Sequence, residues 1–435
     1  MKAQLERYFE FAALGANWRT EILAGATTFI TMAYILFVNP SILAETGMPF
    51  GAVAAATCLS AAFGSILMGA FARYPIALAP GMGLNAYFTY VVVKGMGISW
   101  QVALGAVFFS GIAFLILTMT GLRQKIVEAM PAELYAAVAV GIGIFIAFIG
   151  LKNAGIVVAN PATMVTLGDL GAPNTILAIG GLILMALLMS WGVRAAMLLG
   201  IVGVSATAML TGVVQWKWQP SYLPQLGDTA LQLDLSGALA RGLLEIIFVF
   251  LFVDLFDNLG TLVAVSKKAG LLDENHRIPR VGRILTTDSL ATMFGALTGT
   301  STVVSYIESA SGVAAGGRTG VTAIVTGLLF LLALFAVPVV GIIPAAATAP
   351  ALILVGSLMI SHAAEINWHD AESAIPAFLT ILIIPLSFSI ANGLAFGFIA
   401  WTLLKLFRGK ASQIGWLVYV LTTLFLIRFI YLGKG

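Results

Sequence analysis

This chain has few charged residues and almost none of the residues that form cross-links or metal sites. Charged side chains make up 9% of its 435 residues, against roughly 25% in soluble domains, and 60% are hydrophobic. The single cysteine, Cys58, excludes an internal disulfide and a thiolate zinc site, and the three histidines are too scattered to form a ligand motif. The net charge of +3 is too small to indicate a nucleic-acid-binding surface. We therefore expect a membrane protein without a metal or other cofactor.

Long apolar stretches take the place of the missing charge. Each suits a helix that crosses about 30 Å of hydrocarbon, and unbroken runs of this length exclude a transmembrane β-barrel. The 46 glycines favour helices that approach one another closely in lipid. We predict an all-α polytopic fold with about 14 crossings, near residues 22–44, 51–72, 76–92, 101–121, 132–151, 174–192, 195–214, 243–266, 283–299, 303–316, 319–343, 347–362, 373–390 and 392–407.

The basic residues indicate which side each loop faces. If the N-terminus is cytoplasmic, sixteen Lys and Arg residues fall in cytoplasmic loops and termini, and four fall in the opposite loops. This imbalance follows the positive-inside rule and predicts a multi-pass protein of the cytoplasmic membrane with its N-terminus inside. That N-terminus is too charged for a signal peptide and suits a short interfacial helix. The last segment, 409–435, has an apolar stretch with Arg428 that either spans the membrane or lies in its interface.

The two halves of the chain resemble each other. Leu59-Ser-Ala-Ala-Phe63-Gly64 recurs as Leu290-Ala-Thr-Met-Phe294-Gly295, and each copy leads into a short, broken, Gly-rich segment. We therefore predict two seven-helix repeats. Because each repeat has an odd number of crossings, the second has the opposite orientation in the membrane. Inverted repeats are typical of secondary transporters, which bind substrate near the midplane where discontinuous helices meet. The predicted parts are a first repeat at 1–215, an external linker at 216–242 and a second repeat at 243–408.

Two aspartates, Asp254 and Asp257, lie inside the apolar run 248–260. A carboxylate at the membrane centre costs about 2.5–3.5 kcal/mol, so it persists where it faces a cavity, a partner or a transported proton. Their spacing places both acids on one face of one helix. The alternative is that they snorkel to a helix end, but Lys267 and Lys268 mark that end further along. A functional site is the interpretation that we adopt.

Two interrupted segments occupy equivalent places in the repeats. In the first, Ala79-Pro-Gly-Met-Gly-Leu-Asn85-Ala86 predicts extended backbone followed by a half-helix, whose first N–H groups face protein or a binding cavity. In the second, the hydroxyl-rich segment 298–312 contains Glu308, where a charge is again costly. The alternatives are a glycine-rich packing kink in the first segment and hydroxyls that bond only to their own helix in the second.

Two further polar features are less decisive. Ala26-Thr27-Thr28 carries hydroxyls where its copy in the second repeat carries acids, which places proton chemistry in the second half. Asp288 lies near the cytoplasmic end of its helix, and we expect it to cap that helix or to pair with Arg280 or Arg283.

The side chains gathered in this way predict the class of ligand. Carboxylates, a carboxamide, hydroxyls and aromatic rings suit a flat, neutral heterocycle with N–H donors and ring acceptors. An inorganic anion would be repelled, and these segments contain no Lys or Arg to attract one. Aromatic side chains could stack on such a ring, although in membrane helices they more often serve packing alone. The candidates are Phe29, Tyr34, Tyr87, Phe250, Phe252 and Phe256.

Three motifs in this order resemble the nucleobase permease superfamily, specifically the azaguanine-like branch that carries adenine, guanine and hypoxanthine. They are the segment that ends in Asn85-Ala86, then Asp254-x-x-Asp257-Asn-x-Gly-Thr, and then Thr300-Ser-Thr-x-x-Ser-Tyr-x-Glu308-Ser309, and the similarity covers essentially the whole chain. The related nucleobase-ascorbate branch has an acidic or amide residue, then Asn, then Gly two positions later. The run from Glu308 to Gly312 departs from that pattern, which counts against xanthine, urate or ascorbate.

The resemblance implies a purine nucleobase permease, not an enzyme, which works by proton symport with elevator-type alternating access. Sodium coupling stays open, and such transporters are often homodimers in the lipid membrane. A core domain of crossings 1–4 and 8–11, about 22–121 and 243–343, would hold the substrate and move against a gate domain of crossings 5–7 and 12–14.

By carry-over from the family, four residues occupy its acid and amide positions: Asp257, Asp254, Glu308 and Asn85. The full set predicted to contact the base is Asp257, Glu308, Asn85, Asp254, Phe256, Thr28, Ala86 and Ser309. The coupled proton is expected on Asp254, Asp257 or Glu308, because burial favours the protonated form of a carboxyl group.

Three alternatives stay open at this point. A sulfate or bicarbonate transporter would share the fold, but it needs positive charge or bare helix dipoles at its site. An intramembrane aspartyl enzyme needs two acids on facing helices, which Asp257 and Glu308 could supply, but no Gly-x-Gly-Asp segment accompanies them. An ion channel fits less well, because two broken helices in an inverted repeat suit alternating access.

Overall fold

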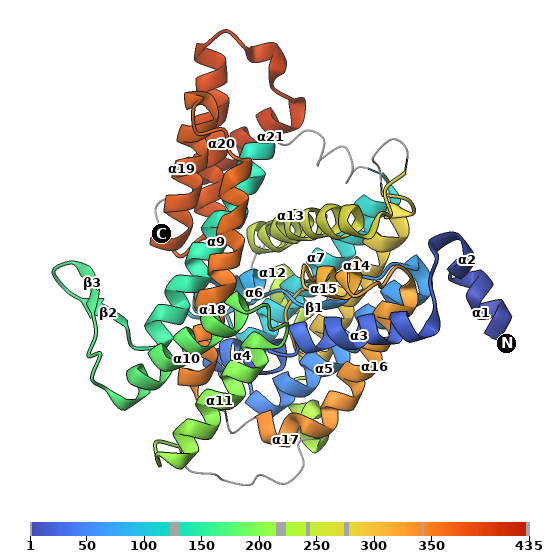
Figure 1. Ribbon diagram of the computed structural model, residues 1–435. Helices are drawn as coiled ribbons and strands as arrows, with labels where there is room; N and C mark the ends of the chain where they lie inside the picture. The colour runs from blue at the N-terminus through green and yellow to red at the C-terminus, as the bar shows by residue number, and fades with distance from the viewer. Residues whose placement is uncertain are drawn as a thin grey trace. The chain divides into compact units, whose positions relative to one another are not determined.

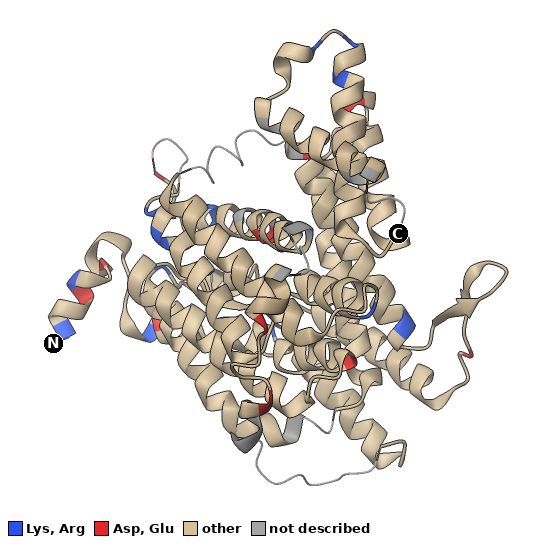
Figure 2. Cartoon of the chain, turned by 180° about the vertical axis from the view of Figure 1, so that it is seen from behind, with Lys and Arg blue, Asp and Glu red and all other residues tan. Residues whose placement is uncertain are grey.

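A computed structural model describes residues 2–121, 131–214, 223–240, 244–273, 278–340 and 343–431, and most of them are helical (Figure 1). Within these ranges, eight helices are long and apolar enough to cross a membrane, and several shorter apolar helices accompany them. Each predicted crossing coincides with a helix or with a short strand that continues as a helix. Charged positions are sparse along these helices (Figure 2). The predicted helical, multi-pass architecture is confirmed.

The chain divides into two compact units, and the first consists of Met1–Met119 and Asn153–Ala351. It contains α1 (Lys2–Tyr8), α2 (Phe11–Leu14), α3 (Trp18–Met32), α4 (Ile35–Leu43), α5 (Phe50–Leu67), β1 (Leu78–Pro80), α6 (Met82–Ala86), α7 (Trp100–Met119), β2 (Val157–Asn160), β3 (Met164–Leu167), α10 (Pro173–Ser190), α11 (Ala196–Leu210), α12 (Leu235–Ala240), α13 (Leu244–Ala269), α14 (Val281–Thr298), β4 (Val303–Ser305), α15 (Ser309–Ala314), α16 (Gly320–Ala333) and α17 (Val337–Val340). Two π-helical turns extend α5 and α6, Met68–Ala72 and Tyr87–Val93.

The second unit consists of Thr120–Lys152 and Leu352–Gly435. Its helices are α9 (Ala132–Asn153), α19 (Ala371–Leu386), α20 (Ile390–Phe407) and α21 (Trp416–Tyr431), and α18 (Ala345–Met359) runs from the first unit into the second. The C-terminal segment that sequence left undecided therefore contains a helix, α21. The division into core and gate domains stays a prediction.

Two three-residue strands from separate halves of the chain form an antiparallel pair in the first unit. The register of β1 and β4 is centred on Ala79, which lies opposite Val304. Any antiparallel pair of this length has such a central residue pair, so the inverted repeat stays a prediction. Each strand leads into a short helix, α6 or α15, so both predicted interruptions are present. Backbone bonds extend the pair at either end, from Gly81 N–H to Thr302 O (2.9 Å) and from Tyr306 N–H to Ala77 O (2.9 Å).

Hydroxyl groups of two neighbouring helices bind the backbone that the short strands leave unpaired. The Ser65 hydroxyl, at the end of α5, accepts the N–H of Leu78 at 2.9 Å and lies 3.1 Å from the carbonyl oxygen of the same residue. Thr292 in α14 contacts Val303 of β4 in the same way, at 3.3 Å and 3.1 Å. Such partners are needed because lipid offers none to an unpaired backbone group.

The repeated Phe-Gly motif packs at this same place. The rings of Phe63 and Phe294 stack with their centroids 4.2 Å apart. A Cβ atom on Gly64 would lie 3.0 Å from Cβ of Leu78, so this position leaves little room for a larger residue. The two motif copies that sequence singled out therefore meet beside the strand pair and support it.

A buried carboxylate joins α3 to the second half of the chain. Glu21 in α3 is fully buried, and its oxygens accept bonds from the start of α16. The donors are the N–H groups of Arg318 (2.9 Å), Thr319 (3.2 Å) and Thr322 (3.3 Å) and the Thr322 hydroxyl (2.6 Å). A carboxylate at a helix N-terminus satisfies the free N–H groups and interacts favourably with the helix dipole.

Replacing Glu21 with Ala is expected to lower stability by about 3 kcal/mol, because several charge-assisted bonds are lost at once from a buried site. Thermal unfolding of the purified protein, followed by fluorescence-detected gel filtration, measures the change. Glu21→Gln keeps the shape and one acceptor, so it should lose less. Glu365→Gln removes a negative charge from an exposed side chain and serves as the control; an equal loss there would show that the bonds to α16 do not matter.

Candidate substrate-binding site

The carboxyl group of Glu308 lies at the point where the second interrupted segment becomes helical. Glu308 is the N-cap residue of α15 and is partly exposed, unlike the strand before it. The phenol of Tyr34 donates a 2.6 Å hydrogen bond to Glu308 Oε1. Tyr34 itself lies in the break between α3 and α4. Two irregular points of the backbone, far apart in sequence, therefore orient one acid.

Asn85 belongs to a chain of buried amides and hydroxyls. Its Nδ2 donates to Asn39 Oδ1 at 2.6 Å, and Asn39 Nδ2 donates to the hydroxyls of Thr57 (2.7 Å) and Thr300 (2.9 Å). All four side chains are fully buried. The network connects α6, α4, α5 and the segment before β4. It fixes the Asn85 carboxamide by its nitrogen and leaves its Oδ1 without a partner among the described residues.

Asp257 lies beside the other end of the strand pair. Its Oδ2 is 3.7 Å from the place where a Cβ would stand on Gly81, the residue that links β1 to α6. The charges of Asp257 and Glu308 both act on the phenol of Tyr306. The Tyr306 hydroxyl donates to Pro80 O at 2.5 Å. The two acids that sequence favoured, one from α13 and one at the N-cap of α15, thus lie at the two ends of the same strand pair.

Asp254 takes part in a different contact. It is 2% exposed, and its Oδ1 accepts a 2.6 Å bond from Asn258 Nδ2. The same nitrogen donates to Asp288 Oδ2 at 2.8 Å, and Asn258 Oδ1 accepts the N–H of Ser305 in β4 at 2.7 Å. One carboxamide therefore joins two buried acids to the backbone of the strand pair.

The expectation that Asp288 caps its helix is wrong. Asp288 lies inside α14 rather than at its cap, is fully buried and accepts a bond from Asn258. Arg280, one of its expected partners, forms an ion pair with Glu10. Sequence position near a basic loop suggested the pairing, but the helical period turns this side chain toward α13.

The remaining predicted contact residues have varied surroundings. Ser309 is fully buried, and its hydroxyl accepts the N–H of Ala77 at 3.0 Å, which fixes the backbone before β1. Thr28 is fully buried, and α15 passes so close that a Cβ on Gly312 would lie 2.1 Å from its hydroxyl. Ala86 is 1% exposed at the end of α6. The side chain of Phe256 lies outside the described residues. Their contacts with a base stay predictions.

Several buried polar atoms around the strand pair have no hydrogen-bond partner among the described residues. Buried groups of this kind are normally satisfied by protein or by ordered water, so an unsatisfied cluster indicates capacity to bind something polar. The atoms are Thr28 Oγ1, Asn85 Oδ1, Ser301 Oγ, Thr302 Oγ1 and Ser305 Oγ.

The aromatic residues contact one another more than they line an open surface. Tyr87 and Phe250 meet edge to face with centroids 5.1 Å apart, and Phe29 meets Phe330 in the same way at 5.0 Å. Phe250 is fully buried and Phe252 is 2% exposed. For these rings the packing alternative describes the observed contacts.

Comparison with known proteins identifies the family. The sequence pattern described as the permease family matches residues 19–396. This chain belongs to the nucleobase permease family. It is 45% identical over 431 residues to the adenine permease AdeP of Escherichia coli, covering 99% of this chain and 97% of that protein. It is 47% identical over 442 residues to the guanine/hypoxanthine permease PbuG of Bacillus subtilis, covering 98% and 100%.

A solved structure shows the same fold at much lower identity. The transmembrane domain of the cyanobacterial bicarbonate transporter BicA superposes on this permease with a TM-score of 0.66 and 18% identity, covering 88% of this chain and 98% of that domain. At this identity the likeness concerns the fold alone. The resemblance stated from the motifs is confirmed by the family match and by the relatives.

Sequence reasoning missed Asn39 and Asn258, the two amides that organise the site. Each is fully buried in an apolar helix. That placement was a usable signal, since an amide in the hydrocarbon region needs partners as an acid does. The partners of Asn39 could not have been named, because they lie 18, 46 and 261 positions away. The bond from Asn258 to Asp254 spans only four residues of one helix, so spacing did offer that partner.

Replacing Asn39 with Ala is expected to raise the KM for nucleobase uptake about tenfold, because Asn85 loses the bond that orients it, a loss of about 1.5 kcal/mol. The turnover rate should change less. Initial rates of radiolabelled base uptake over a concentration series measure both values. Ser41→Ala on the same helix removes a hydroxyl that bonds only to carbonyls of its own turn, and it should leave KM unchanged. An unaltered KM in Asn39→Ala would contradict the positioning role.

Proposed function

We propose that this permease takes up purine nucleobases, adenine, guanine or hypoxanthine, across the cytoplasmic membrane. The observation that supports it most is the placement of Asp257 beside Gly81 and of Glu308 at the N-cap of α15, at the two ends of the β1–β4 pair where the interrupted helices begin. Relatives that carry the names of adenine and guanine/hypoxanthine permeases agree with it. An acidic site suits an uncharged ring with N–H groups, and it repels the anions that a bicarbonate transporter of this fold carries.

The base would be held by its polar edges. Carboxylate oxygens of Glu308 and Asp257 accept bonds from ring or exocyclic N–H groups, and the Asn85 carboxamide accepts with its free Oδ1. Because Tyr34 orients Glu308 and Asn39 orients Asn85, little rotamer freedom is lost when the base binds. The unsatisfied hydroxyls nearby would complete the contacts directly or through water.

Proton symport would use the acids of α13. Asp254 is the proposed carrier, because it is buried and its partner Asn258 also binds the backbone of β4. A change in the charge of Asp254 alters the bond that Asn258 makes and therefore the support of the strand pair. Asp257 and Glu308 would then serve mainly in binding, and a proton shared with the base can reside on either.

The transport cycle would be of the elevator type, with the strand junction moving as part of a rigid core. The similarity of fold to the bicarbonate transporter domain fits this idea. The N-terminus is placed in the cytoplasm on the sixteen-to-four imbalance of basic residues. Assembly as a homodimer in the lipid membrane belongs to the same proposal.

Glu308→Gln and Asp257→Asn are each expected to reduce purine uptake at least about 100-fold, because an amide in place of a carboxylate leaves an N–H of the base or of the protein unpaired in a buried site. Uptake of radiolabelled adenine, guanine and hypoxanthine into proteoliposomes measures the loss. Asp169→Asn in an exposed loop is the matched control. Retained uptake in both site variants, or uptake of sulfate or bicarbonate by the wild type, would refute the proposed site.

Asp254→Asn is expected to abolish accumulation driven by a pH gradient while exchange of internal for external base continues, since the substrate contacts remain. Counterflow in proteoliposomes with and without the gradient separates the two activities. Loss of counterflow as well would place Asp254 in binding instead. If a sodium gradient at constant pH drives accumulation of the base, the coupled ion is sodium and not the proton.

A further inference from the structure

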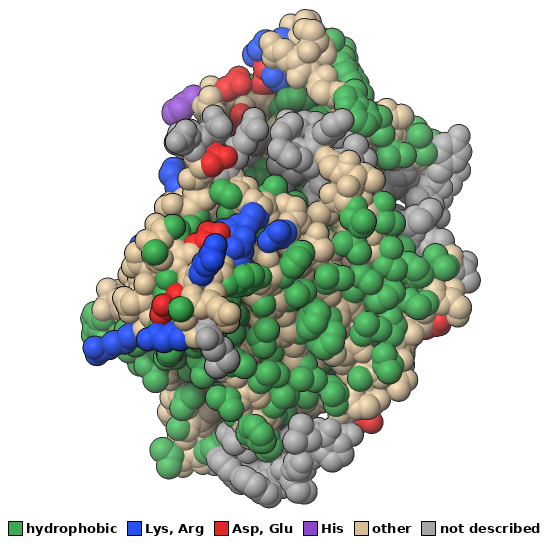
Figure 3. Space-filling model, turned by 90° about the vertical axis from the view of Figure 1, so that its right-hand side faces the viewer, with side chains coloured by type: hydrophobic (Ala, Val, Ile, Leu, Met, Phe, Trp, Pro, Cys, Tyr) green, Lys and Arg blue, Asp and Glu red, His purple; other side chains and the backbone are tan. Residues whose placement is uncertain are grey.

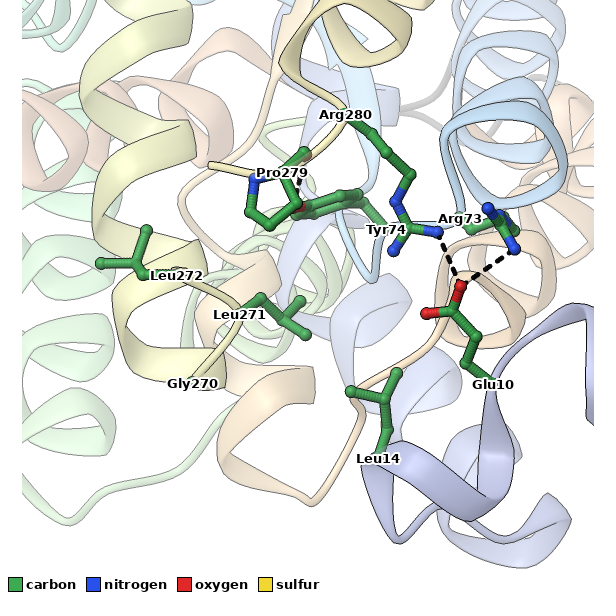
Figure 4. A pocket seen from close by; sticks show the side chains of 9 residues that line it. All are labelled: Glu10, Leu14, Arg73, Tyr74, Gly270, Leu271, Leu272, Pro279 and Arg280. Carbon is green, nitrogen blue, oxygen red and sulfur yellow. Dashed lines mark hydrogen bonds and ion pairs between the residues drawn. The ribbon is translucent and has the colours of Figure 1, made fainter. Parts of the chain in front are cut away.

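A polar cavity in the first unit lies outside the candidate substrate site. Its volume is about 420 Å³, and segments far apart in sequence line it: α2, the turn after α5, the residues after α13 and those before α14 (Figure 4). Glu10, Arg73, Tyr74 and Arg280 supply its polar groups, and Leu14 is part of its apolar wall. In the topology proposed above, every one of these segments is cytoplasmic.

Two guanidinium groups in this cavity share one carboxylate oxygen. Nη1 of Arg73 lies 3.1 Å and Nη1 of Arg280 lies 3.3 Å from Glu10 Oε1 (Figure 4). Neither forms the two-pronged contact that an arginine makes with a carboxylate at its strongest. The only other hydrogen bond of these two side chains among the described residues runs from Arg73 Nη1 to Tyr8 O, at 2.9 Å. Each arginine therefore retains unused donors, and the triad retains one positive charge.

Neighbouring groups hold both arginines in place. The Arg280 guanidinium lies 5.6 Å from the ring centre of Tyr74, and that of Arg73 lies 5.2 Å from the ring centre of Tyr8. Tyr74 donates its hydroxyl to Pro279 O at 2.8 Å. Burial raises the pKa of the Tyr74 phenol to about 12, so it stays a neutral donor at physiological pH. The charged groups are thus set before any ligand arrives.

The backbone at all three charged residues is unusual. Glu10, Arg73 and Arg280 have φ angles of 57°, 61° and 56°, in the left-handed region that residues with a side chain seldom adopt. Such conformations persist where the surroundings impose them, and they collect at functional sites. Three separate segments adopt the same strained conformation in order to bring these charges together.

The surface around the cavity combines positive charge with apolar groups. Leu5, Tyr8 and Phe71 are exposed, and so are Lys2 and Arg7. On the face that Figure 3 shows, Lys and Arg side chains gather in a patch beside a broad hydrophobic surface. This combination is typical of protein surfaces that meet phosphate headgroups at the cytoplasmic leaflet. Asp273 is the other described acid whose charge reaches Tyr74.

We propose that this cavity binds a phosphoryl group, with Arg73 and Arg280 as its ligands and Glu10 as the internal counter-ion that the ligand replaces. A phosphoryl group presents several oxygens and can use the donors that the single Glu10 oxygen leaves idle. An anionic lipid headgroup and a soluble phosphate offer the same chemistry. The inference rests on the cytoplasmic placement proposed for this face, but it does not depend on which base is transported.

Native mass spectrometry of the full-length protein with phosphatidylglycerol or phosphatidylcholine tests the site. Arg73→Gln and Arg280→Gln should each weaken phosphatidylglycerol binding about tenfold or more, because a charge-assisted contact is lost. Glu10→Gln should strengthen it, because the competing carboxylate is removed. Lys268→Gln removes an exposed positive charge outside the cavity and should change binding less than twofold. Arg280→Lys keeps the positive charge but lacks the planar set of guanidinium donors, so it should weaken phosphatidylglycerol binding less than Arg280→Gln does.

A thermal-shift titration with inorganic phosphate distinguishes the two sources. Stabilisation by phosphate that disappears in the Arg→Gln variants supports a soluble ligand, and a response to phosphatidylglycerol alone, with the same dependence, supports a lipid headgroup. Equal losses in Lys268→Gln and Arg280→Gln, or weaker binding in Glu10→Gln, would overturn the site in favour of general surface charge. Purine uptake measured on the same samples keeps this outcome separate from that of the transport function.

Discussion

The pairing of β1 with β4 is the constraint on which the rest of the structure depends. A chain that leaves the helix inside a membrane exposes N–H and C=O groups that lipid cannot satisfy. Here three residues from each half pair with one another, and hydroxyls of Ser65 and Thr292 bind part of what remains. Two short helices begin where the strands end, and their first turns lie next to the acids. The break in the helices is therefore what creates a polar place within an apolar protein.

Key polar side chains at this place are tolerated because they have hydrogen-bond partners, most of them from another segment. Tyr34 orients Glu308, Asn39 orients Asn85, and Asn258 holds Asp254, Asp288 and the backbone of β4 together. Burial makes each of these bonds hard to break without cost, since a lost partner leaves a desolvated group behind. The network thus fixes the binding groups firmly, and it gives the protonation of one acid a short route to the strand pair.

Much of the fold could be predicted from sequence, because hydrophobic length, Pro-Gly interruptions and the cost of buried charge are local signals. The crossings and the two interruptions came from them, whereas the convergence of Asn85, Asp257 and Glu308 on one ligand stays a prediction. The long-range partners of the acids, Tyr34 for Glu308 and Asn258 for Asp288, could not be predicted. Asp254 and Asp257 share a helix face by spacing, yet Asp254 bonds to Asn258 one turn further along the same helix, and Asp257 lies beside Gly81. The triad of Glu10, Arg73 and Arg280 depends on a left-handed backbone conformation at each residue, which the local sequence does not predict.

The symmetric register about Ala79 and Val304 also has a consequence for how the protein is made. The ribosome delivers the first repeat to the membrane before the second exists, so β1 enters without its partner. The unpaired N–H and C=O groups of β1 must then be hydrated, or shielded from lipid by the insertion machinery, until residue 305 has been synthesised. Neither half can complete its own interrupted segment, and a chain cut between the halves would yield two fragments that become stable only by finding each other.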